Sequence, residues 1–247
     1  MLFDESHHNV IEGNSFSHST SEMGIDLITS SDNIIKNNIC SDNEMGGIEL
    51  QGEGANNLVA NNTIERNDDG IYIALSSSNI YENNTIVDNA IGIHVIQFIT
   101  VTTNNVIRNN SISDSTSFGV KLTDGCSGNW LYGNIFSNNH QASSTYSPSH
   151  AQAYDDGSNF WNISSQGNRW SDWRSPDSNN DGVVDSAYII AGGSNQDLRP
   201  IASTGSNGSD LPGLDGGTII AITIAGVVAI PVIGGIWYVR RKRKKGA

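Results

Sequence analysis

A short motif that returns about every 24 residues limits the possible folds of this chain more than any other feature. Successive copies are separated by 22 to 26 residues. A repeat of this length indicates supersecondary units that stack on one another and share a continuous core. The six copies are NVIEGNSF, NIIKNNIC, NLVANNTI, NIYENNTI, NVIRNNSI and NWLYGNIF, which begin at Asn9, Asn33, Asn57, Asn79, Asn105 and Asn129.

A second element follows 13 to 15 residues into five of the copies, as GIDL, GIEL, GIYI, GIHV and GVKL. Both elements read as short strands between Asn, Ser and Gly turns, with no helical periodicity. The Leu frame of leucine-rich repeats is absent, and a propeller blade needs about twice this period. The sequence therefore predicts an all-β parallel β-helix whose coils stack about 4.8 Å apart.

The repeat predicts a division of the chain into about six coils over residues 1–139 and a Trp-rich cap over residues 140–202. Met1–Val10 matches the tail of one coil, so the first coil is expected to be truncated. This start, without a signal peptide, indicates a fragment or a start assigned too late in the gene. A short protein that uses its C-terminal anchor as an internal signal is the alternative.

The composition agrees with such a fold, because only 36% of the residues are hydrophobic while 30 are Asn and 26 are Gly. A coil buries a thin core, and asparagines that stack in successive coils can form amide ladders. We expect a ladder at Asn37, Asn61, Asn83 and Asn109. The Gly before each second element is expected to allow a sharp bend.

Five asparagines head N-x-[ST] triplets, which are acceptor motifs for N-glycosylation. They are Asn61, Asn83, Asn109, Asn162 and Asn207. A side chain held in a ladder is not available to a sugar, so the ladder interpretation is favoured for the first three. Asn207, in the linker, is the best glycosylation candidate.

The C-terminal part predicts a membrane anchor. Residues 216–239 contain no Asp, Glu, Lys, Arg or His and are long enough to span a bilayer as a helix, and the basic run 240–247 follows. Residues 203–215 resemble a flexible Ser/Gly stalk. The expected protein is single-pass in the cell membrane, with its C-terminus inside and its ectodomain outside. Residues 1–215 carry 26 acidic and 7 basic side chains, which argues against a nucleic-acid partner.

Residues 154–200 break the repeat and contain an N-x-W element at Asn159–Trp161, G-N-x-W-x-D at Gly167–Asp172, a nine-residue Asp-rich run at Asp177–Asp185 and D-x-x-P at Asp197–Pro200. With these motifs, residues 1–200 resemble the NosD-like family of right-handed parallel β-helix proteins, also described as carbohydrate-binding and sugar-hydrolysis domains. Anchored chains of this kind are similar to archaeal surface proteins, which suggests the source.

The Asp-rich run has the spacing of oxygen ligands around a hard cation. The expected calcium ligands are Asp177, Asn179, Asp181 and Asp185 with the carbonyl of Val183, and Asp197 could complete the set. Tyr188 stands where an EF-hand loop has its bidentate Glu. An Asx-rich turn without metal remains the alternative. Calcium, if bound, would be a structural ion.

Two sets of residues are candidates for ligand binding. Trp161, Trp170 and Trp173 could stack on sugar rings, although a role in plugging the open end of the helix is favoured. Outward residues of the second elements should form a column, and two of its acids one coil apart would suit glycoside chemistry. This column consists of Asp26, Glu49, Tyr72, His94 and Lys121. Because any outward column in such a fold is polar, catalysis is not favoured.

The family name points toward copper, but copper sites need converging His, Cys or Met. The chain has six scattered His, two Cys and three Met, so the residues give no support for copper delivery. Cys40 and Cys126 are predicted to be about 14 Å apart, too far for a disulfide.

Three functions remain open at this point. The first is a surface module that binds carbohydrate or has a structural role in the envelope, without catalysis. The second is a polysaccharide lyase or glycoside hydrolase that acts along one face of the helix. The third is an accessory factor for the maturation of a copper enzyme.

Overall fold

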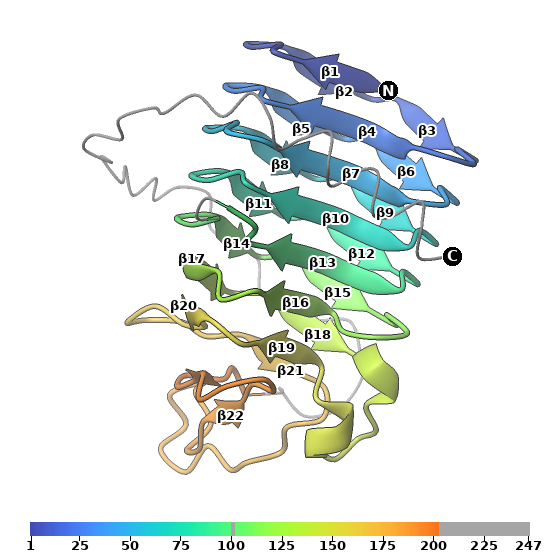
Figure 1. Cartoon of the computed structure of the whole chain (residues 1–247). Coiled ribbons are helices and arrows are strands. Elements are labelled where there is room, and N and C mark those ends of the chain that lie inside the picture. The colour runs from blue at the N-terminus through green and yellow to red at the C-terminus, as the bar shows by residue number, and fades with distance from the viewer. Residues whose placement is uncertain (100–101, 203–247) are drawn as a thin grey trace. The chain divides into compact units, whose positions relative to one another are not determined.

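The computed structural model describes residues 1–99 and 102–202, which wind into a stack of parallel strands (Figure 1). The strands form three sheets of seven strands each, which we call A, B and C. Each coil contributes one strand to sheet B, then one to sheet C and then one to sheet A. Six complete coils result, so the predicted all-β parallel β-helix of about six coils is confirmed. The stalk, the anchor and the basic tail lie outside the described residues. Within those residues, no helix is long and apolar enough to cross a membrane.

Sheet A contains the longest strands, because the second element of each copy is an uninterrupted alternating run. Its register places equivalent residues of successive coils directly side by side. The strands of sheet A are β1 (Leu2–Asp4), β4 (Met23–Ile28), β7 (Gly46–Gln51), β10 (Asp69–Ala74), β13 (Ile91–Ile96), β16 (Val120–Thr123) and β19 (Ala153–Asp155).

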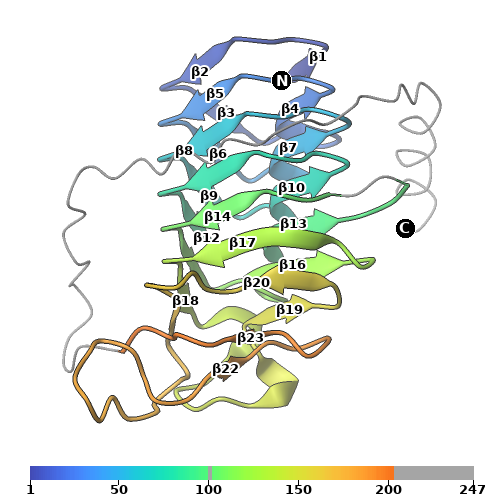
Figure 2. The ribbon, with the colours of Figure 1, turned by 90° about the vertical axis from the view of Figure 1, so that its left-hand side faces the viewer.

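Sheet B is formed by the residues directly after the first Asn of each copy, and Figure 2 shows its strands beside those of sheet A. Most of its strands have three residues, with the middle one pointing into the core. The strands of sheet B are β2 (Val10–Glu12), β5 (Ile34–Lys36), β8 (Leu58–Ala60), β11 (Ile80–Glu82), β14 (Val106–Arg108), β17 (Ser127–Tyr132) and β20 (Ser158–Phe160).

Sheet C follows after a turn of two residues and has the same one-in, two-out pattern. The strands of sheet C are β3 (Ser15–Ser17), β6 (Ile39–Ser41), β9 (Thr63–Glu65), β12 (Thr85–Val87), β15 (Ser111–Ser113), β18 (Ile135–Ser137) and β21 (Arg169–Trp170).

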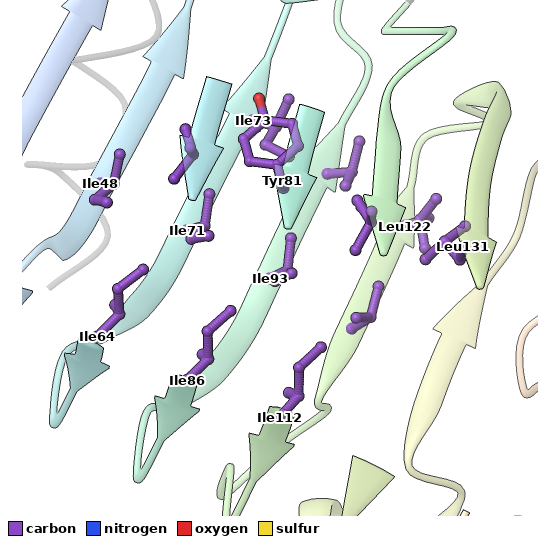
Figure 3. Packing of buried hydrophobic residues seen from close by; sticks show 14 of the residues in the cluster. Ile48, Ile64, Ile71, Ile73, Tyr81, Ile86, Ile93, Ile112, Leu122 and Leu131 are labelled. Atoms are coloured by element: carbon purple, nitrogen blue, oxygen red, sulfur yellow. The ribbon is translucent and has the colours of Figure 1, made fainter. Parts of the chain in front are cut away.

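The core consists of inward residues that stack on the equivalent residue of the next coil. In Figure 3, Ile64, Ile86 and Ile112 point inward from sheet C, and Ile71 and Ile93 face them from sheet A. All five are fully buried. A few β-branched residues per coil fill this narrow interior, which explains why a hydrophobic content of 36% is sufficient.

The glycines before the second strands have a different role from the bend that the sequence suggested. Gly24, Gly47, Gly70 and Gly92 do not have positive φ values. A Cβ on any of them would come within 2.4 to 2.8 Å of the carbonyl oxygen of the equivalent glycine one coil later. These positions therefore need Gly because the backbones of neighbouring coils approach closely.

Buried asparagines form ladders, but the predicted ladder position was wrong by one residue. In each Asn-Asn pair the second Asn is buried and bonds to its equivalent in the next coil. At Asn84, for example, Nδ2 donates to Asn110 Oδ1 at 3.0 Å, and Oδ1 accepts from Asn62 N and Nδ2 at 2.9 and 3.0 Å. The first members take left-handed turns with φ between 55° and 57°, and these are Asn37, Asn61, Asn83 and Asn109.

Three such ladders run along the stack, one at each turn region. The first joins the Asn that begins each copy, and the second joins the Asn before each strand of sheet C. The third, which contains Asn43, Asn67 and Asn89, is interrupted at Ser115 and resumes at Asn139. In the first two ladders each amide donates toward the later coil, so the amide dipoles of a ladder point the same way. In the third, the amide of Asn89 donates instead to Ile64 O and Val87 O, each at 3.0 Å.

The stack continues past residue 139, where the coils were expected to end. After two short 3₁₀ turns, η1 (Asn139–Gln141) and η2 (Pro148–His150), strands β19, β20 and β21 extend the three sheets. An antiparallel pair of β22 (Tyr188–Ile189) and β23 (Gln196–Asp197) follows. The coils and these segments belong to one compact unit, Met1–Ser203. We use "cap" for residues 153–202.

Each ladder ends in the cap on a buried carboxylate. Asn159 Nδ2 donates to Asp155 Oδ1 at 2.9 Å, and Asn168 N donates to Asp197 Oδ2 at 2.7 Å. In the third ladder Gln152 Nε2 donates to Asp172 Oδ1 at 2.6 Å. A carboxylate only accepts, so it satisfies the donors that the last amide of a one-way ladder would otherwise leave buried.

Candidate ligand-binding faces

The outward column on sheet A has the register that the sequence predicted. Asp26 pairs with Glu49, Glu49 with Tyr72, Tyr72 with His94 and His94 with Lys121. Asp26, Glu49 and Tyr72, however, are only 3%, 6% and 2% exposed, and His94 and Lys121 are half-buried. The two acids expected for glycoside chemistry are therefore adjacent but buried.

His94 has two neighbours that fix its ring on this face. Its Nδ1 lies 3.3 Å from Asp69 Oδ1, an ion pair when the imidazole is protonated. Its ring meets Tyr72 edge to face, with centroids 5.5 Å apart. The interactions at His94 are thus with residues of the sheet itself, and they favour a structural role.

The outer face of sheet B carries a continuous column of apolar side chains, which we call the apolar column. Its members pair in register from coil to coil, over about 29 Å at a spacing of about 4.8 Å. Val10 is 59% exposed, Ile80 36% and Phe160 48%, and the others are partly exposed. The apolar column consists of Val10, Ile34, Leu58, Ile80, Val106, Trp130 and Phe160.

The apolar column ends in two stacked aromatic rings. Trp130 on β17 and Phe160 on β20 have centroids 4.2 Å apart and ring planes inclined by 22°. Trp130 is partly exposed and Phe160 is exposed. Aromatic rings that remain on the surface supply large contact area and a flat face to a partner.

Polar side chains run alongside the apolar column, two residues later in each strand except β8, where Ala60 holds this position. Lys36 Nζ lies 3.2 Å from Glu12 Oε2, and Arg108 Nε donates to Glu82 Oε2 at 2.7 Å. Arg108 also reaches the hydroxyl of Tyr132 at 3.4 Å, below the aromatic pair. Sheet B thus presents an apolar strip flanked by paired charges, a combination typical of binding surfaces.

The three tryptophans predicted from the cap motifs lie away from this surface. Trp161 and Trp170 are each 1% exposed. Trp170 stacks between Phe136 and Tyr188, with centroid distances of 4.2 and 3.8 Å. Because these rings continue the core column beyond the last full coil, they plug the end of the helix.

The buried polar groups of the cap hold these rings in place. Trp161 Nε1 donates to Asp155 Oδ2 at 2.8 Å, and Trp170 Nε1 donates to Asp197 Oδ2 at 3.0 Å. Burial raises the pKa of the carboxyls of Asp155, Asp172 and Asp197, although the hydrogen bonds that they accept act in the opposite direction. Trp173 is partly exposed and donates to Ser186 O at 3.1 Å.

The Asp-rich run forms a tight turn whose side-chain oxygens accept hydrogen bonds from its own backbone N–H groups. Asp177 accepts from Asp181 N and Gly182 N, Asn179 accepts from Asp181 N, and Asp181 accepts from Val183 N. Asp185 accepts from Ser178. In residues 1–99 and 102–202, no group of three or more His, Cys, Asp and Glu side chains could hold a metal ion.

Asp197, the residue suggested as a further calcium ligand, is used elsewhere. Both of its carboxylate oxygens lie in the cap interior, where they accept from Asn168, Trp170 and Arg199. The turn at Asp177–Asp185 has the hydrogen bonds of the Asx-rich alternative, Asp197 is bonded elsewhere, and a calcium site at the turn stays a prediction.

Comparisons with known proteins agree with this fold. Residues 1–136, more than half of the chain, match the family described as "Right handed beta helix region". The chain belongs to the right-handed β-helix family. No solved structure matches it.

Within this family the β-helix chain is similar to a protein named "Probable ABC transporter binding protein NosD" from Stutzerimonas stutzeri. The two are 38% identical over 91 residues, which cover 37% of this chain and 19% of that protein. The chain thus spans about a fifth of its curated relative, and the distant NosD-like resemblance is supported. The archaeal source stays a prediction.

Sequence reasoning missed the apolar column of this β-helix protein, although a signal was present. In every copy an apolar residue follows the first Asn, namely Val, Ile, Leu, Ile, Val and Trp. Since the next residue points inward, this residue must point outward. Cys40 and Cys126 are free and buried, as expected, and burial raises the pKa of each thiol to about 12.

Proposed function

We propose that the chain is a non-catalytic binding module that holds an elongated carbohydrate along the outer face of sheet B. The apolar column that ends in Trp130 and Phe160 is the observation that carries this proposal. Exposed apolar surface that is continuous over many residues marks interaction sites. Its straight, one-residue-per-coil geometry suits a partner that is itself linear and repetitive.

Carbohydrate is the favoured ligand class because both parts of this surface match its chemistry. The C–H faces of sugar rings pack on aromatic rings, and hydroxyl groups bond to charged side chains. Trp130 and Phe160 provide the rings, Tyr132 follows two residues after Trp130, and Arg108 joins Tyr132 to Glu82. We further propose that residues 216–239 anchor the module in the cell membrane, with its coils outside.

The test is binding of the purified protein to a panel of neutral and acidic polysaccharides. Substitution of Trp130 or Phe160 by Ala should weaken binding about tenfold or more, because buried aromatic contacts dominate such interfaces. Trp173→Ala is the matched control, since Trp173 is also a partly exposed aromatic residue but is not a member of the apolar column. No product should be released from any polysaccharide. Absence of binding across the panel, or equal binding by Phe160→Ala and the unchanged chain, would overturn the proposal.

The similarity to NosD favours a second candidate, in which the same face binds a transporter protein in the membrane. Cross-linking from a photoreactive group at Phe160 separates the two candidates. A cross-linked membrane protein together with no polysaccharide binding would favour the transporter. Neither copper delivery nor hydrolysis gains support, because the described residues contain no cluster that could hold a metal and Asp26 and Glu49 are buried.

A further inference from the structure

The turn between sheets B and C carries a column of asparagines that lies outside the ladders. Asn61, Asn83 and Asn109 occupy equivalent left-handed positions in consecutive coils, with φ of 56°, 55° and 55°. Their backbone N–H groups donate to the following coil at 3.2, 3.3 and 3.2 Å. The backbone at this position is therefore held rigidly, and the positions repeat about every 4.8 Å.

The side chains of these three residues are available on the surface. Asn61 is exposed, and Asn83 and Asn109 are partly exposed. None of the three amides is bonded to another side chain or to a carbonyl within the described residues, whereas the next residue of each pair is buried in the ladder. The ladder thus uses the neighbouring Asn of each pair and leaves the side chains of these three at the surface.

Each of these asparagines is followed two residues later by a hydroxyl side chain. Thr63, Thr85 and Ser111 begin consecutive strands of sheet C and pair with one another in register. Thr85 and Ser111 are exposed, and Thr63 is partly exposed. Both groups of the N-x-[ST] motif therefore stand on the outside of three consecutive coils.

We propose that Asn61, Asn83 and Asn109 form a column of N-glycosylation acceptors. An oligosaccharyltransferase would supply a sugar linked through phosphate to a membrane lipid. The Asn Nδ2 forms a bond to C1 of the sugar, the bond from C1 to the phosphate oxygen breaks, the lipid phosphate leaves, and the Nδ2 proton passes to a base of the transferase. This proposal shares with the proposed function only the location of the coils outside the membrane.

The fourth described motif provides a contrast. Asn162 Oδ1 accepts from Leu198 N at 3.1 Å, and its Nδ2 donates to the carbonyl of Ile163 at 3.2 Å. The cap therefore uses both ends of this amide, and we expect Asn162 to remain unmodified. Asn37 is the opposite case, because it has the same turn geometry and is exposed but has Ile39 in place of the hydroxyl residue. Its Nδ2 donates to the exposed Glu12 Oε1 at 3.2 Å.

The experiment is glycopeptide and intact-mass spectrometry of the full chain, produced from its own gene in its native cells. Sugar is expected on at least one of Asn61, Asn83 and Asn109 and not on Asn162. Thr85→Ala should remove the sugar from Asn83 while leaving the ladder intact. Ile39→Thr should add sugar at Asn37, and this exposed substitution should not disturb folding.

Two results would overturn the proposal. One is sugar at Asn207 alone, which would show that the transferase acted on the chain but did not modify Asn61, Asn83 or Asn109. The other is a chain without sugar at any position. Polysaccharide binding by Trp130 and Phe160 is measured separately and on other residues, so failure of one proposal is distinguishable from failure of the other.

Discussion

In the six coils the buried ladder amides pair with their equivalents from neighbouring coils, except at the break at Ser115, whereas in the cap the buried polar partners differ at each position. Asn62, Asn84 and Asn110 share one geometry, and each satisfies the next. In the cap, Asp155 and Asp197 accept hydrogen bonds from side-chain amides, backbone N–H groups and indoles. These arrangements do not repeat from coil to coil.

The two regions nevertheless depend on each other. A ladder in which every amide donates in one direction has aligned dipoles and ends with buried donors. A negative or acceptor group is favourable there for the same reason that an acid is favourable at the N-terminus of a helix. The coils thus require a particular kind of end, and the carboxylates of the cap provide it.

The largest expected effect comes from breaking a ladder in mid-stack. Asn84→Ala removes the acceptor of Asn62 N and Nδ2, the side-chain donor to Val59 O and one of the two donors to Asn110 Oδ1. At about 1–3 kcal/mol for each buried group left unsatisfied, we expect a loss of about 3–5 kcal/mol in the free energy of unfolding. Chemical denaturation monitored by circular dichroism measures it.

The matched control is the neighbouring residue. Asn83→Gly keeps the left-handed turn, since Gly adopts φ near +55° without strain, and it should change stability by less than about 1 kcal/mol. If Asn83→Gly lowers the free energy of unfolding as much as Asn84→Ala, the ladder does not run through the second Asn of each pair.

The position of the ladder within each Asn-Asn pair shows how much of the fold the sequence alone could predict. The repeat length and the alternating pattern were sufficient to predict the strands and the stacking. Within an Asn-Asn pair, however, both residues have the same chemistry, and the position chosen was wrong. The first and last copies held the missing information, because Gly13 and Gly133 replace the first Asn and both have φ of 69°. A position open to Gly is a left-handed turn, so the other Asn must be the buried one.

The next effect concerns the end of a ladder. Asp197→Ala leaves Asn168 N and Trp170 Nε1 without their buried acceptor. We expect a loss of about 2–4 kcal/mol in the free energy of unfolding and a weaker near-ultraviolet signal from the cap tryptophans. Asp156→Ala is the control, since this neighbouring acid of the cap is exposed. Equal stability of the two variants would mean that the ladders need no carboxylate end.

The cap was less predictable than the coils for a physical reason. Asp155, Asp172 and Asp197 come from separate segments, and only the folded chain brings each one beneath its ladder. The local run Asp177–Asp185 has a much clearer spacing and attracted the metal interpretation instead. Likewise, Trp161 and Trp170 resemble sugar-binding residues until their burial is known.

The pH dependence of stability tests the buried carboxyls of the cap. Burial raises the pKa of Asp155, Asp172 and Asp197 in the folded chain, so the folded chain binds these protons more tightly than the unfolded chain. The resulting stabilisation is complete below the unfolded pKa of about 3.9 and is lost as the pH rises through the folded values. We therefore expect Tm to rise as the pH is lowered from neutral through the folded pKa values of these carboxyls.

The variant Asp172→Asn should flatten this pH dependence, because it removes one of the three titrating groups. Asp42 has the opposite shift, since Arg66 lowers its pKa, but it is on the surface and should contribute little. A Tm that falls on acidification, equally in both proteins, would show that the cap carboxyls do not titrate in this way.

One substitution in the core of the coils should raise the free energy of unfolding by a smaller amount. Tyr81 is fully buried in the core, and its hydroxyl has no hydrogen-bond partner within the described residues. The equivalent residues of the neighbouring coils, Val59 and Ile107, are aliphatic. Tyr81→Phe removes a buried polar atom and should raise the free energy of unfolding by about 1 kcal/mol. A decrease measured by chemical denaturation would mean that the hydroxyl is satisfied.

The smallest expected effect is that of calcium on the cap. Asp177, Asn179 and Asp181 already accept hydrogen bonds from backbone N–H groups of their own turn, so the folded turn needs no cation to satisfy them. We expect Tm in calcium and in chelator to agree within about 1 °C, because only ligands that bind the folded state raise it. A rise of several degrees, lost in Asp181→Asn, would contradict this expectation. It would also widen the difference between the regions, since the cap would then depend on a metal while the coils depend on amides alone.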